Sequence, residues 1–263
     1  MRNFALIVAV DLPDPRQVLD VVKTVGPIVD GVKVSPVTLI QAGLDILGRI
    51  REIIGDKPIL VDLKVADIGF QGEEGWQGTN GKIIKGLAGS GATHVTVHGF
   101  PGPVSVAEAV ETARAEGLEV LLLPLMSHAG ASLFFSRPLG RADLAYAALK
   151  AGLHIRISQR IPCNDVTDGI ILLGEALNVS GYIGPATRPG DLERYRAATE
   201  KTIWCPGFGR QDRHGRNLEE QFRQWAQILG PSSAAIVGST ICQAKDPKSA
   251  AQEVIALRDL VAW

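Results

Sequence analysis

The sequence has few cysteines and no long apolar run. Its 263 residues include only three cysteines, Cys163, Cys205 and Cys242. Their number is odd and they lie far apart without a C-x-x-C pair, which excludes a disulfide framework and the usual zinc or redox motifs. We therefore expect reduced thiols in a cytoplasmic protein. No apolar run is long enough to cross a membrane, and the residues after Met1 lack the cleavage pattern of a secretory signal.

An excess of charge of either sign is also missing. Lys and Arg total 27 against 28 Asp and Glu, a formal net charge of -1. Neither nucleic acid nor an anionic membrane is therefore an expected partner. No Walker or dinucleotide fingerprint follows a strand, and His154 and His214 have no partner at metal-ligand spacing. His98 and His128 are interpreted as packing in loops rather than as catalytic groups.

The sequence does contain a regular alternation of short apolar runs and helical patterns. Apolar residues make up 46% of the chain, enough for a sizeable core. We predict strands at residues 5–10, 30–34, 59–66, 95–98, 120–125, 181–185, 202–205 and 234–237. Helical patterns occupy residues 15–22, 37–54, 79–90, 104–115, 143–151, 167–177, 192–200, 218–228 and 250–261, and residues 155–158 could form one more short strand.

Repeated strand-then-helix units favour a closed barrel of parallel strands. Eight strands without internal linkers predict a single-domain (β/α)8 barrel over residues 1–263. A doubly wound sheet is the alternative, and only the strand count argues against it. In such barrels the active site lies at the C-terminal ends of the strands.

The third predicted strand carries charges inside an apolar run. Residues two apart in a strand point the same way, so we expect Asp62 and Lys64 to share one face. Asp67 lies just past the strand, where a loop can return it to the same place. Because unpaired buried charges are costly, these groups should neutralise one another or meet a ligand. The alternative is a salt-bridged strand end without chemistry.

Polar residues gather where the predicted strands end. They are Asp11, Lys33, Asp62, Lys64, Asp67, Ser127 and Gln211. This clustering predicts an active site at that end of the barrel. Loop ends are polar in most proteins, but that tendency does not explain charges at Asp62 and Lys64 within the strand.

The third strand also carries a resemblance to a known family. Its residues 62–68, Asp-Leu-Lys-Val-Ala-Asp-Ile, resemble the D-x-K-x-x-D-I signature of the orotidine 5'-monophosphate decarboxylase family. Residues 97–102, 126–128, 184–189 and 206–209 are similar to its fourth- to seventh-strand segments. The resemblance covers most of the chain. It implies a (β/α)8 barrel that decarboxylates orotidine 5'-monophosphate to UMP without a metal or organic cofactor.

The resemblance also implies roles for the charged residues. Lys64 would stabilise the negative charge left by CO2 and donate the proton, and Asp62 would lie near the substrate carboxylate. Lys33 and Asp67 would complete an alternating chain of charges that keeps Lys64 protonated. Asp67 and Thr79 match residues that reach the neighbouring subunit's site, which implies a homodimer.

Further residues match positions that contact substrate in the family. Asp11 and Lys33 would lie near the ribose, Ser127 would contact the pyrimidine, and Gln211 would reach the substrate. The loops that close the site would contribute Pro185, Gly209, Gly238 and Ser239, the last three offering backbone amides to the phosphate.

Three features depart from the family pattern. Ser239, in Val-Gly-Ser-Thr-Ile, stands where the phosphate-binding arginine is expected. Arg210 or Arg213, or else Arg216, is expected to replace it, although these arginines could equally form a solvated loop. Residues 70–78 and 136–165 look like insertions, the second where a lid would lie.

Two other functions remain open on the sequence. A 3-keto-6-phosphogluconate decarboxylase or hexulose-phosphate synthase uses a similar motif but binds Mg2+ through an acid on the second strand, where Lys33 stands here. A non-catalytic phosphate-ligand-binding barrel is the other alternative. The intact Asp62, Lys64 and Asp67 argue against it.

Overall fold

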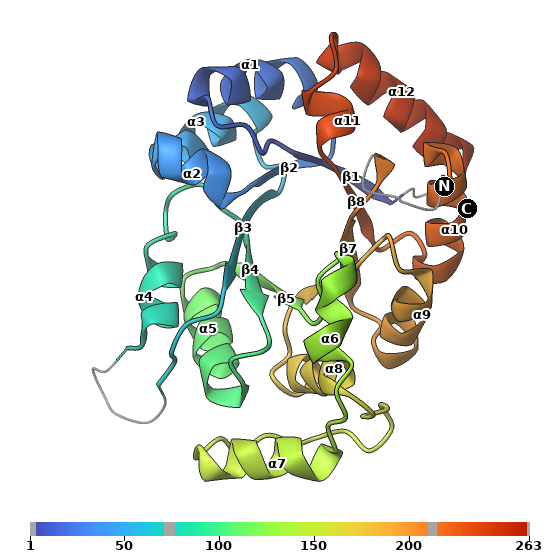
Figure 1. Cartoon of the computed structure of the whole chain (residues 1–263). Coiled ribbons are helices and arrows are strands. Elements are labelled where there is room, and N and C mark those ends of the chain that lie inside the picture. The colour runs from blue at the N-terminus through green and yellow to red at the C-terminus, as the bar shows by residue number, and fades with distance from the viewer. Residues whose placement is uncertain (1–3, 71–76, 210–214, 262–263) are drawn as a thin grey trace.

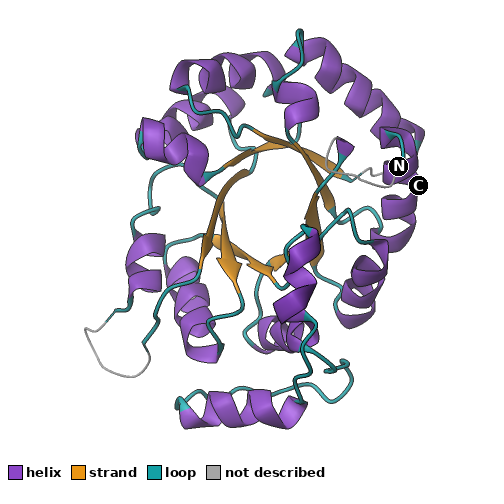
Figure 2. Ribbon diagram, in the orientation of Figure 1, coloured by secondary structure: helices purple, strands orange, loops and turns teal. Residues whose placement is uncertain are grey.

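The computed structural model describes residues 4–70, 77–209 and 215–261 of the chain. Eight parallel strands pair in chain order and close into a barrel, with the helices arranged around it (Figures 1 and 2). The strands are β1 (Ala5–Ala9), β2 (Gly31–Val34), β3 (Ile59–Val65), β4 (His94–His98), β5 (Glu119–Leu123), β6 (Gly181–Ile183), β7 (Thr202–Pro206) and β8 (Ala234–Val237). The predicted barrel is confirmed, and the doubly wound alternative is wrong.

The helices follow the strands as the alternation predicts. They are α1 (Pro15–Val25), α2 (Pro36–Ala42), α3 (Asp45–Ile54), α4 (Thr79–Lys85), α5 (Pro103–Ala115), α6 (Ser132–Phe135), α7 (Arg141–Lys150), α8 (Val166–Ala176), α9 (Pro189–Ala198), α10 (Leu218–Leu229), α11 (Ser239–Cys242) and α12 (Pro247–Leu260). A 3-10 turn, Ala129–Ala131, precedes α6. In the described part of the chain, no helix is long and apolar enough to span a membrane.

The strands are mostly apolar because they are buried on both faces. In β1, Leu6 and Val8 pack outward against the helices, whereas Ile7 and Ala9 face a smaller cluster inside the barrel. Trp204 belongs to that inner cluster, and its ring lies 4.7 Å from the ring of His94. Apolar side chains therefore fill the barrel beneath its C-terminal mouth.

Two local predictions at helix ends have different outcomes. Asp14 caps α1 by accepting from the Arg16 amide, with Pro15 at the first helical position, as predicted. The single helix predicted over residues 37–54 is wrong, because Gly43 adopts φ 70° and separates α2 from α3. The apolar stripe runs on across this break, so periodicity alone does not reveal it.

The segment predicted as an insertion, residues 136–165, leaves the barrel wall and returns. Pro138 and Asp165 form an isolated bridge at its base, and α7 lies outside the ring of barrel helices (Figure 1). Ala148 and Leu153 bury against Ala107 of α5. Residues 155–158 form no strand, contrary to the sequence prediction; their isoleucines pack onto the core instead.

Candidate active site

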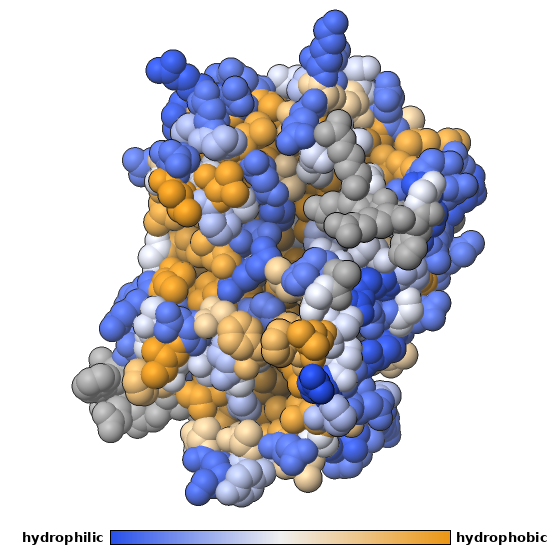
Figure 3. All heavy atoms as spheres, in the orientation of Figure 1, coloured by the Kyte–Doolittle hydropathy of each residue, from blue (hydrophilic) through white to orange (hydrophobic). Residues whose placement is uncertain are grey.

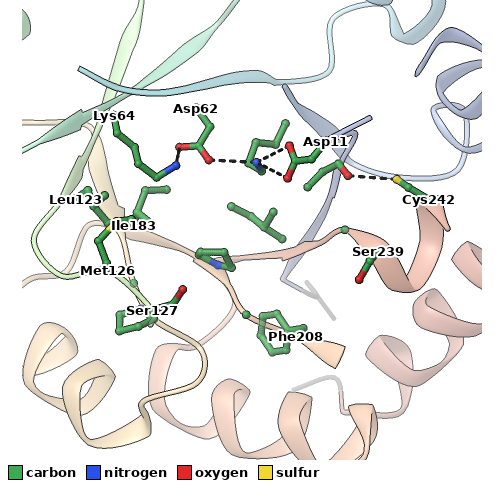
Figure 4. Close-up of a pocket in the computed structure, with 18 of the residues that line it drawn as sticks. Asp11, Asp62, Lys64, Leu123, Met126, Ser127, Ile183, Phe208, Ser239 and Cys242 are labelled. Carbon is green, nitrogen blue, oxygen red and sulfur yellow. Dashed lines mark hydrogen bonds and ion pairs between the residues drawn. The ribbon is translucent and has the colours of Figure 1, made fainter. Parts of the chain in front are cut away.

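A cavity of about 360 Å3 opens at the C-terminal ends of the strands (Figure 4). Eight of the residues predicted to form the site line it: Asp11, Lys33, Asp62, Lys64, Ser127, Pro185, Gly238 and Ser239. They come from six different strands or the loops that follow them. The fold therefore brings together groups that are up to 228 residues apart in sequence, counting from Asp11 to Ser239.

One wall of the cavity is a chain of alternating charges. The Lys33 ammonium lies 2.9 Å from the Asp11 carboxylate and 3.1 Å from that of Asp62. The Lys64 ammonium lies 2.8 Å from the other Asp62 oxygen. Figure 4 shows Asp11, Asp62 and Lys64 along one side of the cavity. The charges alternate in the order Asp11, Lys33, Asp62, Lys64. Within one chain Asp67 does not extend this row beyond Lys64.

The inner pair of this chain is held in its charged form. Burial disfavours charge on Lys33, but the carboxylates of Asp62 and Asp11 outweigh it, and the Lys33 pKa is raised. Burial likewise opposes charge on Asp62, but Lys33 and Lys64 overcome it, and the Asp62 pKa is lowered. Paired charges therefore persist at a depth where single charges would not.

The backbone of β3 is irregular where the charges lie. Its pairing with β4 passes from Val61↔Val95 to Val65↔Val97, so extra residues bulge between them. Lys64 within the bulge has φ 51°, a left-handed conformation that costs a non-glycine residue about 1–2 kcal/mol. Regular strand alternation, from which we expected Asp62 and Lys64 to share a face, therefore does not hold here. The bulge brings their side chains together instead.

Sequence reasoning missed Thr96, which faces this bulge from β4. Its hydroxyl accepts from the Lys64 amide at 2.8 Å and donates to Asp62 Oδ1 at 2.9 Å. The available signal was a hydroxyl-bearing residue between two valines, Val95 and Val97, in the middle of a buried strand. His98, two residues on, stacks with Phe135 at 5.1 Å between ring centroids. Burial, and then the nearby Lys64, lower its pKa to about 4, so it is neutral at pH 7.

The wall opposite the charges is apolar. Leu123, Met126, Ile183 and Phe208 line it, with Ser127 beside them (Figure 4). The Thr187 hydroxyl donates to the Ser127 carbonyl at 3.0 Å and joins the loops after β5 and β6. A planar ring fits between apolar side chains on one side and charged groups on the other.

The loops after β7 and β8 form the remaining side of the cavity. Gly238 and Ser239 line it. Gly209 does not, and its amide donates to Gln221 at 2.8 Å; its contact with a phosphate remains a prediction. Cys242, which sequence reasoning also missed, lines the cavity and donates to the Ala9 carbonyl at 3.2 Å.

The arginines predicted to bind phosphate have no described position in the cavity. Arg210, Gln211 and Arg213 lie outside the described residues. Arg216 is described and does not line the cavity; its guanidinium donates to Gln224 of α10.

Asp67 and Thr79 lie away from the cavity of their own chain. The Asp67 side chain is exposed and accepts from the Ile68 amide at 2.6 Å, and its own amide donates to Asn80 at 2.8 Å. Thr79 opens α4 and is half-buried. Asp67 therefore does not return to the Lys64 site within one chain, contrary to the simplest expectation. The position of Asp67 within one chain does not test the prediction that it reaches the neighbouring subunit's site.

The acids of the cavity are already engaged with ammonium groups. Asp11 and Asp62 both contact Lys33, and in the part of the chain that the structure describes no cluster of His, Cys, Asp and Glu is suited to a metal ion. The arrangement offers ammonium groups beside carboxylates and an apolar slot. Such a site can stabilise negative charge that develops on a bound ring and deliver a proton to it.

Comparison with known proteins places this geometry in context. The model of the orotidine 5'-phosphate decarboxylase / HUMPS family matches residues 5–254, which include all of β1 to β8. The orotidine 5'-phosphate decarboxylase of Methanosarcina mazei is 29% identical over 255 residues, 96% of this chain and 94% of the relative. That of Methanosphaera stadtmanae is 30% identical over 253 residues, 95% of each chain.

Solved structures agree with these sequence matches. The orotidine 5'-monophosphate decarboxylase of Methanocaldococcus jannaschii, crystallised with the inhibitor BMP, is similar with a TM-score of 0.76 and 26% identity, covering 98% of this chain and 99% of that one. The Pyrococcus horikoshii enzyme gives a TM-score of 0.69 at 25% identity, covering 97% and 98%. The likeness thus extends over the whole barrel.

Proposed function

Because the chain belongs to the orotidine 5'-phosphate decarboxylase / HUMPS family, we infer that it decarboxylates orotidine 5'-monophosphate to UMP in pyrimidine biosynthesis. The observation that carries this inference is the row Asp11, Lys33, Asp62 and Lys64 along the cavity, opposite an apolar wall. The cytoplasm is the proposed compartment, since all three cysteines are free thiols.

Lys64 is the proposed proton donor. Departure of CO2 leaves negative charge on a ring carbon, and an ammonium placed there both stabilises the charge and supplies the proton. The Asp62 carboxylate lies 2.8 Å from the Lys64 ammonium and holds it at the wall of the cavity. Lys64 is also partly accessible, with 35% of its side chain exposed to the cavity and solvent, so a bound ring can reach it.

Asp62 is proposed to lie beside the substrate carboxylate. Two like charges at ~4 Å repel by about 4 kcal/mol at an effective dielectric of ~20. Lys33, Lys64 and Thr96 all contact the Asp62 carboxylate, which therefore cannot swing away when a second carboxylate arrives. Loss of CO2 relieves the repulsion and contributes to the rate.

The sister activities of the family are the second candidate. They require Mg2+ bound by an acid on the second strand, where this chain has Lys33. The Lys33 ammonium lies between Asp11 and Asp62, so it repels a divalent cation from the oxygens that would bind one. This contact favours the metal-independent decarboxylation.

The decisive experiment follows the absorbance of the orotidine ring when orotidine 5'-monophosphate is added to purified protein. We expect conversion to UMP that survives EDTA and is lost in Lys64→Ala. Lys23→Ala, which alters an exposed lysine of α1, should leave the rate unchanged and serves as the control. A wild-type protein that makes no UMP, or makes it only without EDTA, would refute the proposal.

We also propose a homodimer in which Asp67 and Thr79 serve the neighbouring cavity. Apolar side chains lie exposed around them: Ile40 is 79% exposed, Ile68 53% and Ile83 37%. Figure 3 shows apolar atoms over α2 and α4 at the left edge of the molecule. Exposed apolar side chains of this kind are typical of an interface, and Asp67, next to Ile68, would enter the partner's site from this side.

The phosphate cation is proposed to be Arg210 or Arg213. Ser239 brings a hydroxyl, but no charge, to the phosphate side of the cavity, and a charge-assisted hydrogen bond contributes about 1.5–3 kcal/mol. The loop that follows β7 carries both arginines close in sequence to Phe208, which lines the cavity.

A further inference from the structure

The bulge in β3 leaves the Lys64 backbone outside the regular ladder. Pairing with β4 resumes only at Val65↔Val97, and Lys64 is one of two non-glycine residues with positive φ among those described. A buried amide at such a point needs a partner from elsewhere. Something must therefore hold this strained backbone in place.

The Thr96 hydroxyl supplies that partner. It accepts from the Lys64 amide at 2.8 Å, and the same oxygen donates to Asp62 Oδ1 at 2.9 Å. Asp62 Oδ1 is also the atom that the Lys64 ammonium contacts at 2.8 Å. One hydroxyl thus joins the backbone of the lysine to the carboxylate that its side chain touches.

The environment of Thr96 fixes this arrangement. Its side chain is fully buried, with 0% of the residue exposed, so no water can replace it at the Lys64 amide. Both hydrogen-bonding capacities of the hydroxyl are used, one as donor and one as acceptor. Valine has the same shape but neither capacity, whereas serine keeps both.

We propose that Thr96 is a positioning residue that holds Lys64 and Asp62 in the geometry for protonating the ring carbon. This rests on the proposed decarboxylation. Thr96 acts through Lys64 and Asp62 and does not itself line the cavity. Its loss lets the bulge relax and moves the Lys64 ammonium relative to the reacting carbon.

The test compares Thr96→Val with Thr96→Ser and with a matched control at the other end of the same strands. The Thr93 hydroxyl accepts from the Ile59 amide of β3 at 2.9 Å and donates to the Ile59 carbonyl at 3.1 Å. Thr93→Val therefore removes the same kind of side-chain-to-strand contact, far from the cavity. Measurements are kcat and KM for orotidine 5'-monophosphate, calorimetric UMP binding, and Tm.

We expect Thr96→Val to lower kcat by about 10- to 100-fold, the effect of displacing a reacting group by ~1 Å. KM and UMP affinity should stay within about threefold, because the binding surface is intact. Thr96→Ser should restore kcat to within about threefold of the wild type. Thr93→Val should lower Tm as much as Thr96→Val does, with kcat unchanged.

Three kinetic results would overturn the proposal: a Thr96→Val kcat within about twofold of wild type, a Thr96→Ser variant as slow as Thr96→Val, or a Thr93→Val variant equally slow. A crystal structure of Thr96→Val should show Lys64 out of the left-handed region, and an unchanged Lys64 would also overturn it. A wild-type protein that makes no UMP is a different outcome: it refutes the decarboxylation itself, and with it any role of Thr96 in that reaction.

Discussion

The Lys33 ammonium lies 3.1 Å from the Asp62 carboxylate, deep in the wall of the barrel. The Lys33 side chain is only 7% exposed and that of Asp62 only 14%. This contact ties β2 to β3 and determines which oxygen of Asp62 remains for Lys64. The proposed catalysis therefore uses the same ion pairs that we expect to stabilise the fold.

Replacing Lys33 tests the contribution of these pairs to stability. Lys33→Met leaves Asp11 and Asp62 without the cation between them, and breaking a buried pair in this way typically costs about 3–5 kcal/mol. We expect a loss of that size in the free energy of unfolding by urea at pH 7. The exposed control Lys23→Met should change it by less than ~0.5 kcal/mol.

A second substitution checks the cause. Adding Asp62→Asn to Lys33→Met removes the buried carboxylate that has lost one of its two cations, so the double variant should be more stable than Lys33→Met alone. A double variant that loses the full sum of both single effects would contradict the ion-pair explanation.

The pH dependence of stability follows from the directions of the two shifts. The Asp62 pKa is lowered from 3.8, so its contribution is present above pH 3.8 and is lost as pH falls through the lower folded value. The Lys33 pKa is raised from 10.5, so its contribution is present below pH 10.5 and is lost as pH rises through the higher folded value.

These two pKa shifts predict that the stabilisation by the ion pair is independent of pH over a middle range. The difference in unfolding free energy between the wild type and Lys33→Met/Asp62→Asn should be constant from about pH 5 to 9 and shrink below and above this range. Urea unfolding at several pH values measures it. A difference that changes steadily between pH 6 and 8 would mean that another group, such as a histidine, controls it.

The barrel could be predicted from the sequence because the signals for its strands and helices are local. Each strand is a short apolar run, and β8 occupies the residues predicted for it, 234–237. Lys64 and Asp62 could also be predicted as site residues, because charges inside a buried apolar run are costly unless they are paired or bind a ligand. The bulge at Lys64 and the contact of the Thr96 hydroxyl with it could not be predicted, because both depend on the register in which β3 pairs with β4.

Other failures have the same origin. The helix break at Gly43 leaves the apolar stripe uninterrupted, so it has no periodic signature. The row of charges includes Asp11 beside Lys33, which depends on the position of β1 beside β2. Within one molecule the row stops at Lys64 and does not continue to Asp67. Neither the periodicity of a helix nor the motif of a single strand contains this information.

Glu108 of α5 provides a test of how the base of the loop after β3 is held. Its buried carboxylate accepts from the amides of Gly78 and Gly81 at the start of α4. In Glu108→Gln an NH2 group faces one of these amides, which leaves a buried donor unpaired and costs about 1–3 kcal/mol. Urea unfolding should show this loss. Glu111→Gln, exposed on the same helix, should not, and equal effects would contradict the explanation.

The phosphate proposal predicts a change in KM. Alanine at the arginine that replaces the expected cation, Arg210 or Arg213, should raise KM for orotidine 5'-monophosphate by about 10- to 150-fold, the equivalent of one charge-assisted hydrogen bond. Arg216→Ala is the matched control, because Arg216 contacts Gln224 rather than the cavity. An unchanged KM in both Arg210→Ala and Arg213→Ala would leave the phosphate without its proposed cation.

The shared site predicts that two impaired variants restore one another. Lys64→Ala and Asp67→Ala should each be strongly impaired alone. When equal amounts exchange subunits, half of the dimers are mixed, and one of their two sites then has both Lys64 and Asp67. Activity should therefore rise to about a quarter of the wild-type value. The control is Lys64→Ala mixed with Asp62→Ala: these residues pair within one chain, so no mixed dimer has an intact site and activity should not return. If tagged subunits exchange and the first mixture stays inactive, Asp67 does not serve the neighbouring cavity, and its exposed position beside Ile68 needs another explanation.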